Sequence, residues 1–307
     1  MNDASSRATQ LLQHPVSSPA APPSRGQTGP ARLLFLGTQG WIPTPRRETT
    51  CLAFLWKGTL LIFDAGTGLS RFLQPPAAAY LEAADQIHLI LTHYHLDHCV
   101  GVSFITGLFS GREVTIHVPD ADLNGVSPQD GLPQLIRSPF FPAPLAEQKG
   151  VRLVSLSAGD NDIGGIRVRA RAQCHADTTA GYRVEDLFTL ATDTVADEGT
   201  AELARGAQLL LHEAWIEGGE IDEREHPELI RTTMGSHTSA RQAASLAARA
   251  GVGQLVLIHL NPLLAEEYYE TMGRSAREVF PATVVAQDLL EHVFPGTEAG
   301  PTAFARD

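Results

Sequence analysis

Short apolar runs separated by turn residues recur along the chain from residue 32 onward. Apolar runs of this length, bounded by glycine, proline and polar residues, are typical of strands that are covered on both faces. Lys57-Gly58 joins two of these runs and predicts a hairpin turn. The runs of strand length are residues 32–36, 51–56, 59–63, 88–91, 114–118, 151–156, 166–172, 187–191, 209–211 and 255–258.

Helical patterns are fewer. Residues 240–250 are rich in alanine and other strong helix formers and end at Gly251, and residues 77–84 and 263–279 also have helical patterns. Many strands with interspersed helices predict one α/β domain, in which helices cover the outer faces of the sheets. The proline-rich residues 121–150 are predicted to form a long loop or insertion beside the functional site.

The two ends of the chain differ from this central part. Residues 1–31 are rich in Ser, Pro and Ala and lack the apolar core of a secretory signal, so they predict a disordered tail. We expect the folded domain to span residues 32–296 and residues 297–307 to form a flexible C-terminal tail.

Composition narrows the class of protein. The 307 residues are 43% hydrophobic and 19% charged, which favours a packed globular chain. The sequence contains no apolar run of about 18 residues, the length that a membrane helix needs. Its three cysteines are too few for a disulfide framework. The formal net charge of −12 disfavours a broad basic face for duplex DNA. We therefore expect a cytoplasmic protein that binds neither membranes nor duplex DNA.

The strongest chemical signal is the segment from His93 to His98, which follows the apolar run 88–91. In an extended chain, residues two apart point the same way, so His93 and His95 can bind one ion. A turn after His95 would direct Asp97 and His98 toward a neighbouring point. Four potential ligands within six residues predict a metal site, since a surface turn does not require three imidazoles.

Further potential ligands follow other apolar runs. His175, Asp193 and His259 each come after a predicted strand, as His93 does. A single histidine at the end of a strand is usually structural or solvated. The shared placement of all three therefore favours one site at a common edge of the sheets.

These positions lie in motifs that resemble the metallo-β-lactamase superfamily, and within it the ribonuclease Z (tRNA 3′-processing endoribonuclease) branch. The resemblance extends from about Leu33 to Pro295 and implies an αββα sandwich with a two-metal centre between the sheets at one edge. The matching motifs are Leu36-Gly37-Thr38-Gln39-Gly40, Phe63-Asp64-Ala65-Gly66, His93 to His98, Gly181-Tyr182-Arg183, Ala191-Thr192-Asp193-Thr194, His212-Glu213-Ala214, Ser236-His237-Thr238 and His259.

The resemblance also implies roles for individual residues. Two Zn²⁺ ions are implied, with Mn²⁺ or Fe²⁺ as alternatives. Asp64 resembles an aspartate that orients a ligand histidine, with a turn residue as the alternative. The implied ligands are His93, His95 and His175 for the first ion, Asp97, His98 and His259 for the second, and Asp193 as the bridge between them.

Asp97, His237 and Glu213 are the candidate catalytic residues. Two ions about 3.5–4 Å apart can hold a hydroxide nucleophile and neutralise charge on phosphorus, but an alkoxide leaving group still benefits from a proton donor. The resemblance implies that His237 is this donor and that Glu213 orients it. The alternatives are a capping or surface histidine and a solvated carboxylate. Because His237 would precede a helix N-terminus, which disfavours a charged imidazole, we predict that the two residues act as a unit.

Two departures from the family pattern bear on the substrate. Gly181-Tyr182-Arg183 runs almost directly into the next strand, which leaves no room for a protruding tRNA-binding arm. His259-Leu260-Asn261 lacks the arginine that family members often have after the last ligand. We therefore expect a phosphodiesterase that acts either on RNA or on a smaller or cyclic phosphodiester. Hydrolysis of thioesters, lactones or sulfate esters is the alternative from another class of reaction.

Two further expectations concern partners. Arg46 and Arg47 lie in the loop after the first strand and could contact the phosphate of the substrate, with a solvated loop as an equal alternative. The resemblance also favours a homodimer.

Overall fold

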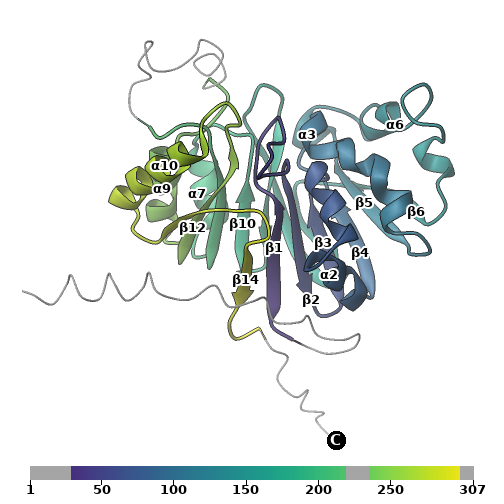
Figure 1. Cartoon of the computed structure of the whole chain (residues 1–307), viewed down its shortest axis with the longest axis horizontal. Coiled ribbons are helices and arrows are strands. Elements are labelled where there is room, and N and C mark those ends of the chain that lie inside the picture. Colours follow the sequence, from purple (N-terminus) through teal and green to yellow (C-terminus); the bar gives the residue numbers. More distant parts are fainter. Residues whose placement is uncertain (1–28, 219–234, 298–307) are drawn as a thin grey trace, which may run out of the picture.

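The computed structural model of the chain describes residues 29–218 and 235–297. Two seven-stranded sheets pack face to face, and helices cover both outer faces, as Figure 1 shows. The predicted αββα sandwich is confirmed. Most of the two predicted tails, residues 1–28 and 298–307, lies outside the described residues, so the domain boundaries stay predictions.

The first sheet carries the N-terminal half of the domain. Its strands β3 to β6 run parallel to one another. The strands, in their order across the sheet, are β14 (Glu291–Phe294), β1 (Ala31–Gly37), β2 (Cys51–Trp56), β3 (Thr59–Phe63), β4 (Gln86–Ile90), β5 (Val114–Pro119) and β6 (Val151–Leu156).

The second sheet carries most of the C-terminal half. Strands β10 to β13 are parallel, and β7 to β9 form an antiparallel meander beside them. The order across the sheet is β13 (Thr283–Val285), β12 (Gln254–Leu260), β11 (Leu209–Ala214), β10 (Phe188–Ala191), β9 (Thr179–Val184), β8 (Ile166–Gln173) and β7 (Gly159–Ile163).

The helices are mostly short. No helix among the described residues is long and apolar enough to cross a membrane. On the side of the first sheet lie η1 (Thr67–Leu73), α2 (Ala77–Ala83), α3 (Leu96–Cys99), η2 (Val100–Phe104), α4 (Ile105–Leu108), α6 (Leu132–Leu135) and η3 (Leu145–Glu147); on the other side lie α7 (Glu198–Ala204), α9 (Ala240–Ala250) and α10 (Glu266–Val279). The short helix α5 (Ala121–Asn124) contacts β8 and β9 of the second sheet and places Leu123 in the core between the sheets.

Two of the predicted helices agree with the structure to within one residue, and one does not. Helices α2 and α9 match, and α9 begins with a capping box between Ser239 and Gln242. Helix α10 begins at Glu266 instead of residue 263, because residues before it form a turn in which Asn261 accepts a hydrogen bond from Leu263. The predicted insertion, residues 121–150, contains only α5, α6 and η3 and packs its Leu132 and Leu145 against the first sheet.

The apolar runs follow from burial on both faces of each strand. In β1, Leu33 and Phe35 enter the core between the sheets, whereas Leu34 and Leu36 pack under the helices of the first sheet. The second sheet alternates in the same way: Val256 of β12 enters the core between the sheets and Leu257 packs under α7, α9 and α10. Strict alternation between two apolar environments produces uninterrupted hydrophobic sequence.

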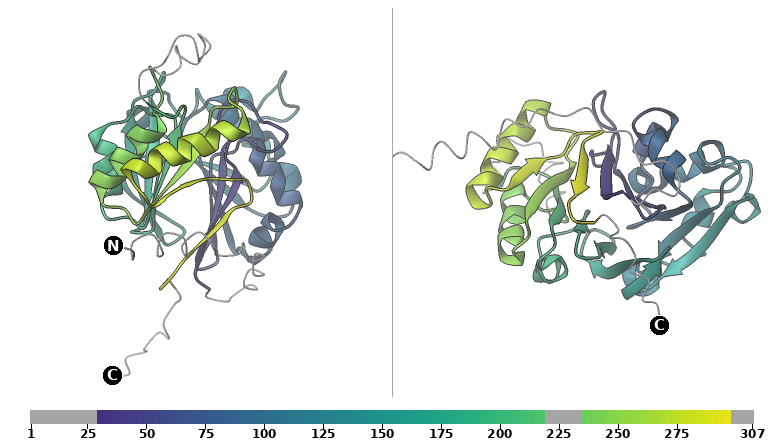
Figure 2. Two further views of the ribbon diagram at one scale, coloured as in Figure 1. Left: turned by 60° about the vertical axis from the view of Figure 1, so that its left-hand side comes forward. Right: turned by 90° about the horizontal axis from the view of Figure 1, so that it is seen from below.

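The two sheets are tied together near one edge. Tyr182 of β9 donates a hydrogen bond to the carbonyl of Leu91, 2.6 Å away, and Ala180 donates to the carbonyl of Thr92. The C-terminal segment also crosses from β13 in one sheet to β14 in the other, which Figure 2 shows from below. The ends of β4, β8, β10 and β12 therefore keep fixed relative positions, and the candidate ligands follow those ends.

Candidate metal centre

The first group of donors comes from the segment after β4. His93 and His95 lie in non-helical chain, and α3 begins at Leu96, so Asp97 and His98 lie on its first turn. His95 has extended backbone angles (φ −61°, ψ 147°). The predicted change from extended chain to a turn within this motif is therefore present.

The second group comes from the other sheet. His175 follows β8, Asp193 follows β10, and His259 lies near the end of β12. Asp193 and His259 have positive φ angles of 49° and 47°, and Asp64, which follows β3, has a φ of 58°. Residues other than glycine rarely adopt this conformation, and it persists where the surroundings enforce it, most often at functional sites.

Asp193 lies at the centre of the cluster. Its Oδ2 is 3.0 Å from His98 Nε2 and 3.2 Å from His259 Nε2, whereas its Oδ1 is 3.4 Å from His175 Nε2. The two carboxylate oxygens therefore face different histidines, one set on each side. This is the arrangement expected of a carboxylate that bridges two ions.

The remaining predicted ligands surround this carboxylate. Asp97 Oδ2 lies 3.2 Å from His98 Nε2 and 3.5 Å from His259 Nε2. The structure thus brings all seven predicted ligands together, in groups whose donor atoms lie within 4.8 Å of one another. These groups are His93, His98 and Asp193; His95, His175 and Asp193; Asp97, His98 and His259; and Asp193, His237 and His259.

The donor set fits divalent transition-metal ions. Imidazole nitrogens and carboxylate oxygens are the ligands that zinc prefers besides thiolates. His93 Nε2 is buried and has no hydrogen-bond partner in the described part of the chain, as expected for a nitrogen that binds an ion. Burial would raise the pKa of Asp193, but His259 and His98 hold it well below its usual range, so this carboxylate is ionised.

Neighbouring groups orient the ligand histidines. Asp64 Oδ2 lies 2.8 Å from His98 Nδ1, and its Oδ1 accepts a hydrogen bond from the backbone N–H of Thr92. His175 Nδ1 donates to the carbonyl of Ser236, 2.8 Å away. Each contact uses Nδ1 and so leaves Nε2 for an ion. The position of Asp64 fits the predicted orienting aspartate.

His237 and Glu213 form a buried pair beside the cluster. His237 Nδ1 is 2.6 Å from Glu213 Oε2, and Glu213 Oε1 accepts a hydrogen bond from the N–H of Thr194. Burial alone would raise the pKa of Glu213, but the neighbouring His237 lowers it to about 2. The ring of His237 lies 4.8 Å from that of His175, so the pair adjoins the predicted ligands.

Sequence reasoning missed two residues of the site. The indole of Trp215 stacks on the imidazole of His237, with centroids 4.1 Å apart and planes 6° apart. The only feature of the sequence that pointed to Trp215 was its position directly after His212-Glu213-Ala214. The exposed Asp177 also lies 3.1 Å from His95 Nε2, and nothing in its sequence context indicated this contact.

The two arginines that were predicted to contact the substrate phosphate, Arg46 and Arg47, differ in burial and in contacts. The buried guanidinium of Arg47 binds Glu266 at 2.6 Å and also donates to Thr38 and to the carbonyl of Ala286. These contacts fix the loop after β1 to α10 and leave Arg47 with a structural position. Arg46 is exposed.

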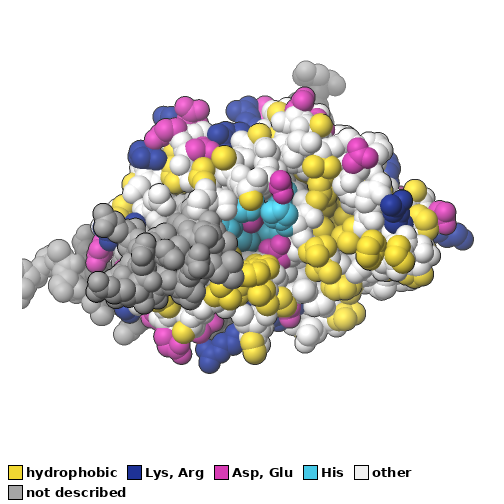
Figure 3. Space-filling view, turned by 90° about the horizontal axis from the view of Figure 1, so that it is seen from above, with side chains coloured by type: hydrophobic (Ala, Val, Ile, Leu, Met, Phe, Trp, Pro, Cys, Tyr) yellow, Lys and Arg dark blue, Asp and Glu magenta, His cyan; other side chains and the backbone are white. Residues whose placement is uncertain are grey.

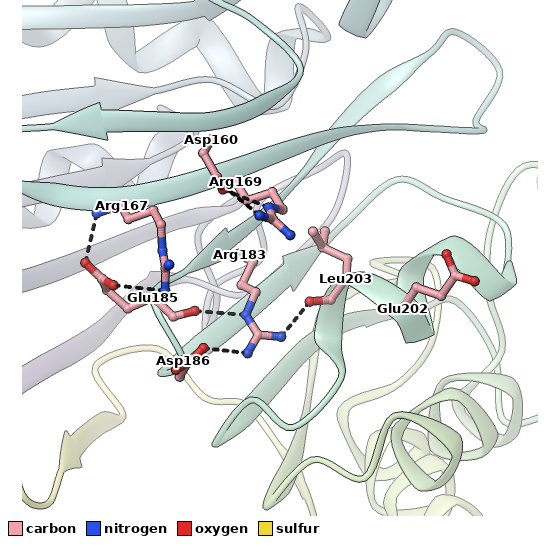
Figure 4. Close-up of a pocket in the computed structure, with 8 residues that line it drawn as sticks. All are labelled: Asp160, Arg167, Arg169, Arg183, Glu185, Asp186, Glu202 and Leu203. Carbon is pink, nitrogen blue, oxygen red and sulfur yellow. Dashed lines mark hydrogen bonds and ion pairs between the residues drawn. The ribbon is translucent and has the colours of Figure 1, made fainter.

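A second hollow lies on strands β7 to β9 and contains none of the predicted site residues. Figure 4 shows that its arginines point toward acidic neighbours, and every guanidinium there is paired: Arg167 with Glu185, Arg169 with Asp160, and Arg183 with Asp186. Paired arginines at an exposed surface leave little net positive charge for an anionic ligand.

An αββα sandwich with histidines and aspartates gathered where its strands end defines a hydrolase of the metallo-β-lactamase type. The family model described as "Beta-lactamase superfamily domain" matches residues 59–260, and the chain belongs to that superfamily. The predicted resemblance to its ribonuclease Z-like branch is confirmed, and the chain is a metal-dependent hydrolase.

The similarity to individual relatives extends over most of the chain. It is 29% identical to a Ribonuclease Z from Kineococcus radiotolerans, over 76% of this chain and 84% of that relative. It is 30% identical to a Ribonuclease Z from Mycobacterium avium, over 85% of this chain and 97% of that relative. The metallo-β-lactamase fold protein YhfI from Bacillus subtilis has a similar fold, with a TM-score of 0.67 at 20% identity over 86% of this chain and 99% of that one.

Proposed function

We propose that the chain is a ribonuclease Z-like phosphodiesterase that holds two Zn²⁺ ions and uses His237 with Glu213 as its proton donor. The observation that carries the proposal is the Asp193 carboxylate, whose two oxygens face His175 on one side and His98 with His259 on the other. When bound, two divalent ions activate water and neutralise the charge that develops on phosphorus.

The ligand roles proposed are those that the family resemblance implies. His93, His95 and His175 would hold one ion, and Asp97, His98 and His259 the other. Asp97 is itself held in place, because its Oδ2 accepts a hydrogen bond from the N–H of Trp41, 2.7 Å away. The carboxylate of Asp64 contacts Nδ1 of His98 and so keeps this imidazole oriented.

His237 supplies the proton that the leaving group needs. Glu213 binds Nδ1, so Nε2 is the nitrogen that can give a proton to the leaving oxygen as the P–O bond breaks. The ionised Glu213 stabilises the positive charge on His237 before transfer and offsets the N-terminal end of α9, which begins three residues later. Trp215 restricts rotation of the imidazole by stacking on it.

A small phosphodiester is the second candidate substrate. The turn between β9 and β10 is closed by a hydrogen bond from Leu187 to the carbonyl of Val184, so the chain has no arm at this point. The net charge of −12 also disfavours tight binding of a whole tRNA. Both features favour a substrate smaller than tRNA.

A substrate panel tests these alternatives. The zinc-loaded chain is incubated with bis(p-nitrophenyl) phosphate, a cyclic nucleotide, a precursor tRNA with a 3′ trailer, a thioester and a lactone, with Asp193→Ala as the inactive control. Cleavage of at least one phosphodiester is expected. Cleavage of the thioester or lactone alone would overturn the proposal, and cleavage of small phosphodiesters without the precursor tRNA would remove the tRNA substrate.

Assembly and location belong to the same proposal. The family resemblance supports a homodimer, and the small number of cysteines supports a location in the cytoplasm.

A further inference from the structure

Exposed apolar side chains concentrate around the candidate metal centre. Eight large hydrophobic side chains are exposed in the described part of the chain, and four of them adjoin the site. Leu96 lies between His95 and Asp97, Leu263 follows His259 by four residues, and Trp41 with Ile42 lies in the loop that contacts Asp97. Figure 3 shows hydrophobic side chains bordering the histidines. Half of the exposed apolar set therefore surrounds one polar centre.

The backbone of Trp41 is held tightly at this centre. Its N–H donates to Asp97 Oδ2, and the N–H of Ile42 donates to the carbonyl of Gly40, 2.7 Å away, so Trp41 is the middle residue of a three-residue turn. Trp41 has a φ of +55°, which is rare for a bulky residue. A bulky side chain kept in this conformation indicates that its position is enforced.

Gly40 fixes the same turn from the other side. Its N–H donates to the carbonyl of Leu260, next to His259, and a Cβ on Gly40 would lie 2.6 Å from the imidazole of His259. The turn thus contacts a predicted ligand on each side, Asp97 and His259. The backbone of Trp41 is therefore held beside two predicted metal ligands, at the place where a substrate phosphate would bind.

The indole itself is available. It is 45% exposed, and no ring contact or hydrogen bond joins it to another residue in ranges 29–218 and 235–297. The other two tryptophans are engaged: Trp215 stacks on His237, and Trp56 donates to the carbonyl of Thr297. A partly exposed indole without a ring partner in the described ranges is suited to stacking against a flat ring, and such stacking does not depend on which base is presented.

We propose that Trp41 is a specificity-determining residue that stacks on the nucleobase next to the scissile phosphodiester. Ile42 contributes apolar surface beside it. This inference rests on the proposed function and narrows it, because the substrates preferred would be nucleotide phosphodiesters of any base and not aliphatic phosphodiesters. Stacking of the base on the indole does not require a cationic side chain of the protein.

The first test is a binding measurement. Isothermal titration of the zinc-loaded full chain compares adenosine 5′-monophosphate with ribose 5-phosphate, which carries the same phosphate and sugar but no base. Wild type is expected to bind the nucleotide about 5- to 150-fold more tightly, the range that corresponds to stacking of one base. Trp41→Ala should abolish the difference, and Trp41→Phe should keep part of it.

Two controls separate stacking from other effects. Val293→Ala removes an apolar side chain of similar exposure (43%) from β14, which pairs with the opposite end of β1, and should leave the ratio unchanged. Nucleotide binding should quench tryptophan fluorescence in Trp56→Phe but not in Trp41→Phe, if Trp41 is the ring that is stacked.

The inference is overturned if wild type shows no preference for the nucleotide, or if Trp41→Ala keeps the preference while binding two zinc ions. It is also overturned if Trp41→Ala instead dissociates a dimer, since a second copy of the chain would then cover this surface. A chain that shows the Trp41-dependent preference but hydrolyses no phosphodiester would refute the proposed function and leave the stacking inference standing.

Discussion

Glu213 lies between two histidines that have different expected tasks. Its Oε2 is 2.6 Å from His237 Nδ1 and 3.7 Å from His259 Nδ1, within a fully buried environment. A carboxylate this deeply buried is tolerated only where charged or polar groups surround it. The proposed proton donor His237 and the proposed ligand His259 are therefore linked through one side chain, and a change at Glu213 is expected to affect both.

The substitution His237→Ala tests whether His237 gives a proton to the leaving group. With an RNA dinucleotide, whose leaving oxygen is a ribose hydroxyl, kcat should fall by about 10²- to 10⁴-fold. With bis(p-nitrophenyl) phosphate it should fall less than about 5-fold, because p-nitrophenolate leaves without a proton. Steady-state kinetics on both substrates measures the difference. Equal losses on the two substrates would contradict the assigned role.

Arg46 and Arg47 are neighbours in sequence, but Arg46 is exposed and Arg47 is buried. Arg47→Met removes the buried partner of a half-exposed ion pair and leaves Thr38 and the carbonyl of Ala286 without a donor, so the free energy of unfolding should fall by about 1 to 3 kcal/mol. Arg46→Ala, at an exposed site, should change it by less than about 0.5 kcal/mol. Urea unfolding of both variants gives the comparison. Similar values for the two would show that the Arg47 contacts do not stabilise the fold.

Among the elements, β4 and β5 carry a buried histidine pair outside the metal centre. His88 Nδ1 is 3.0 Å from His117 Nε2. Burial, with His88 and Arg152 nearby, lowers the pKa of His117 to about 4, against about 6.5 in an unfolded chain. The folded state therefore keeps His117 neutral at pH values where the unfolded chain would protonate it.

This pair predicts acid sensitivity with a definite sign. Above about pH 6.5 the pair has no pH-dependent effect, and as the pH falls from 6.5 toward 4 the unfolded state binds one more proton and stability is lost. His117→Gln should reduce the slope of unfolding free energy against pH by up to about 1.4 kcal/mol per pH unit in this window. Urea unfolding between pH 4.5 and 7.5 measures it. An unchanged slope would contradict the prediction.

The elements also show what the sequence could predict. Strands buried on both faces, such as β3 and β12, have uninterrupted apolar sequences and were predicted at nearly the correct residues. The strands β7, β9, β13 and β14 were missed, and all but β9 lie at an edge of a sheet. β7 has the polar sequence Gly-Asp-Asn-Asp-Ile, and β13 has three residues, so pairing with a neighbour and not local pattern decides their conformation.

The same reasoning applies to the site. The residues that cluster at the candidate site could be predicted because several lie in one short motif and others come at the ends of apolar strands, as with Asp193 after β10. The stacking of Trp215 and the contact of Asp177 with His95 depend on tertiary placement alone. Arg47 carried a plausible sequence context for phosphate binding, but its guanidinium faces Glu266. Side-chain direction in a loop does not follow from position in the chain.

Over the whole molecule, the predicted ligands divide between the two halves of the sandwich. His93, His95, Asp97 and His98 follow a strand of the first sheet, whereas His175 and Asp193 follow strands of the second and His259 lies near the end of its strand β12. Bound ions would therefore connect the two sheets at the edge where Tyr182 and Ala180 already join them through hydrogen bonds. Ions that bind only the folded state add to its stability.

Removal of the metal should therefore lower the melting temperature. At zinc concentrations about 100 times the dissociation constant, binding contributes about 2.7 kcal/mol, which corresponds to a decrease of at least about 5 °C on chelation. Calorimetry of the wild-type chain with zinc and with chelator measures the shift. Asp193→Ala, which lacks the bridging carboxylate, should show little difference between the two conditions. A wild type insensitive to chelation would argue against ions that link the sheets.

The most direct test is anomalous X-ray diffraction at the zinc edge from crystals of the zinc-loaded chain. Two anomalous peaks about 3.5–4 Å apart are predicted, with Asp193 between them and three histidine or aspartate ligands around each. A single peak, no peak, or a map in which His175 or Asp193 points away from the zinc would contradict the account.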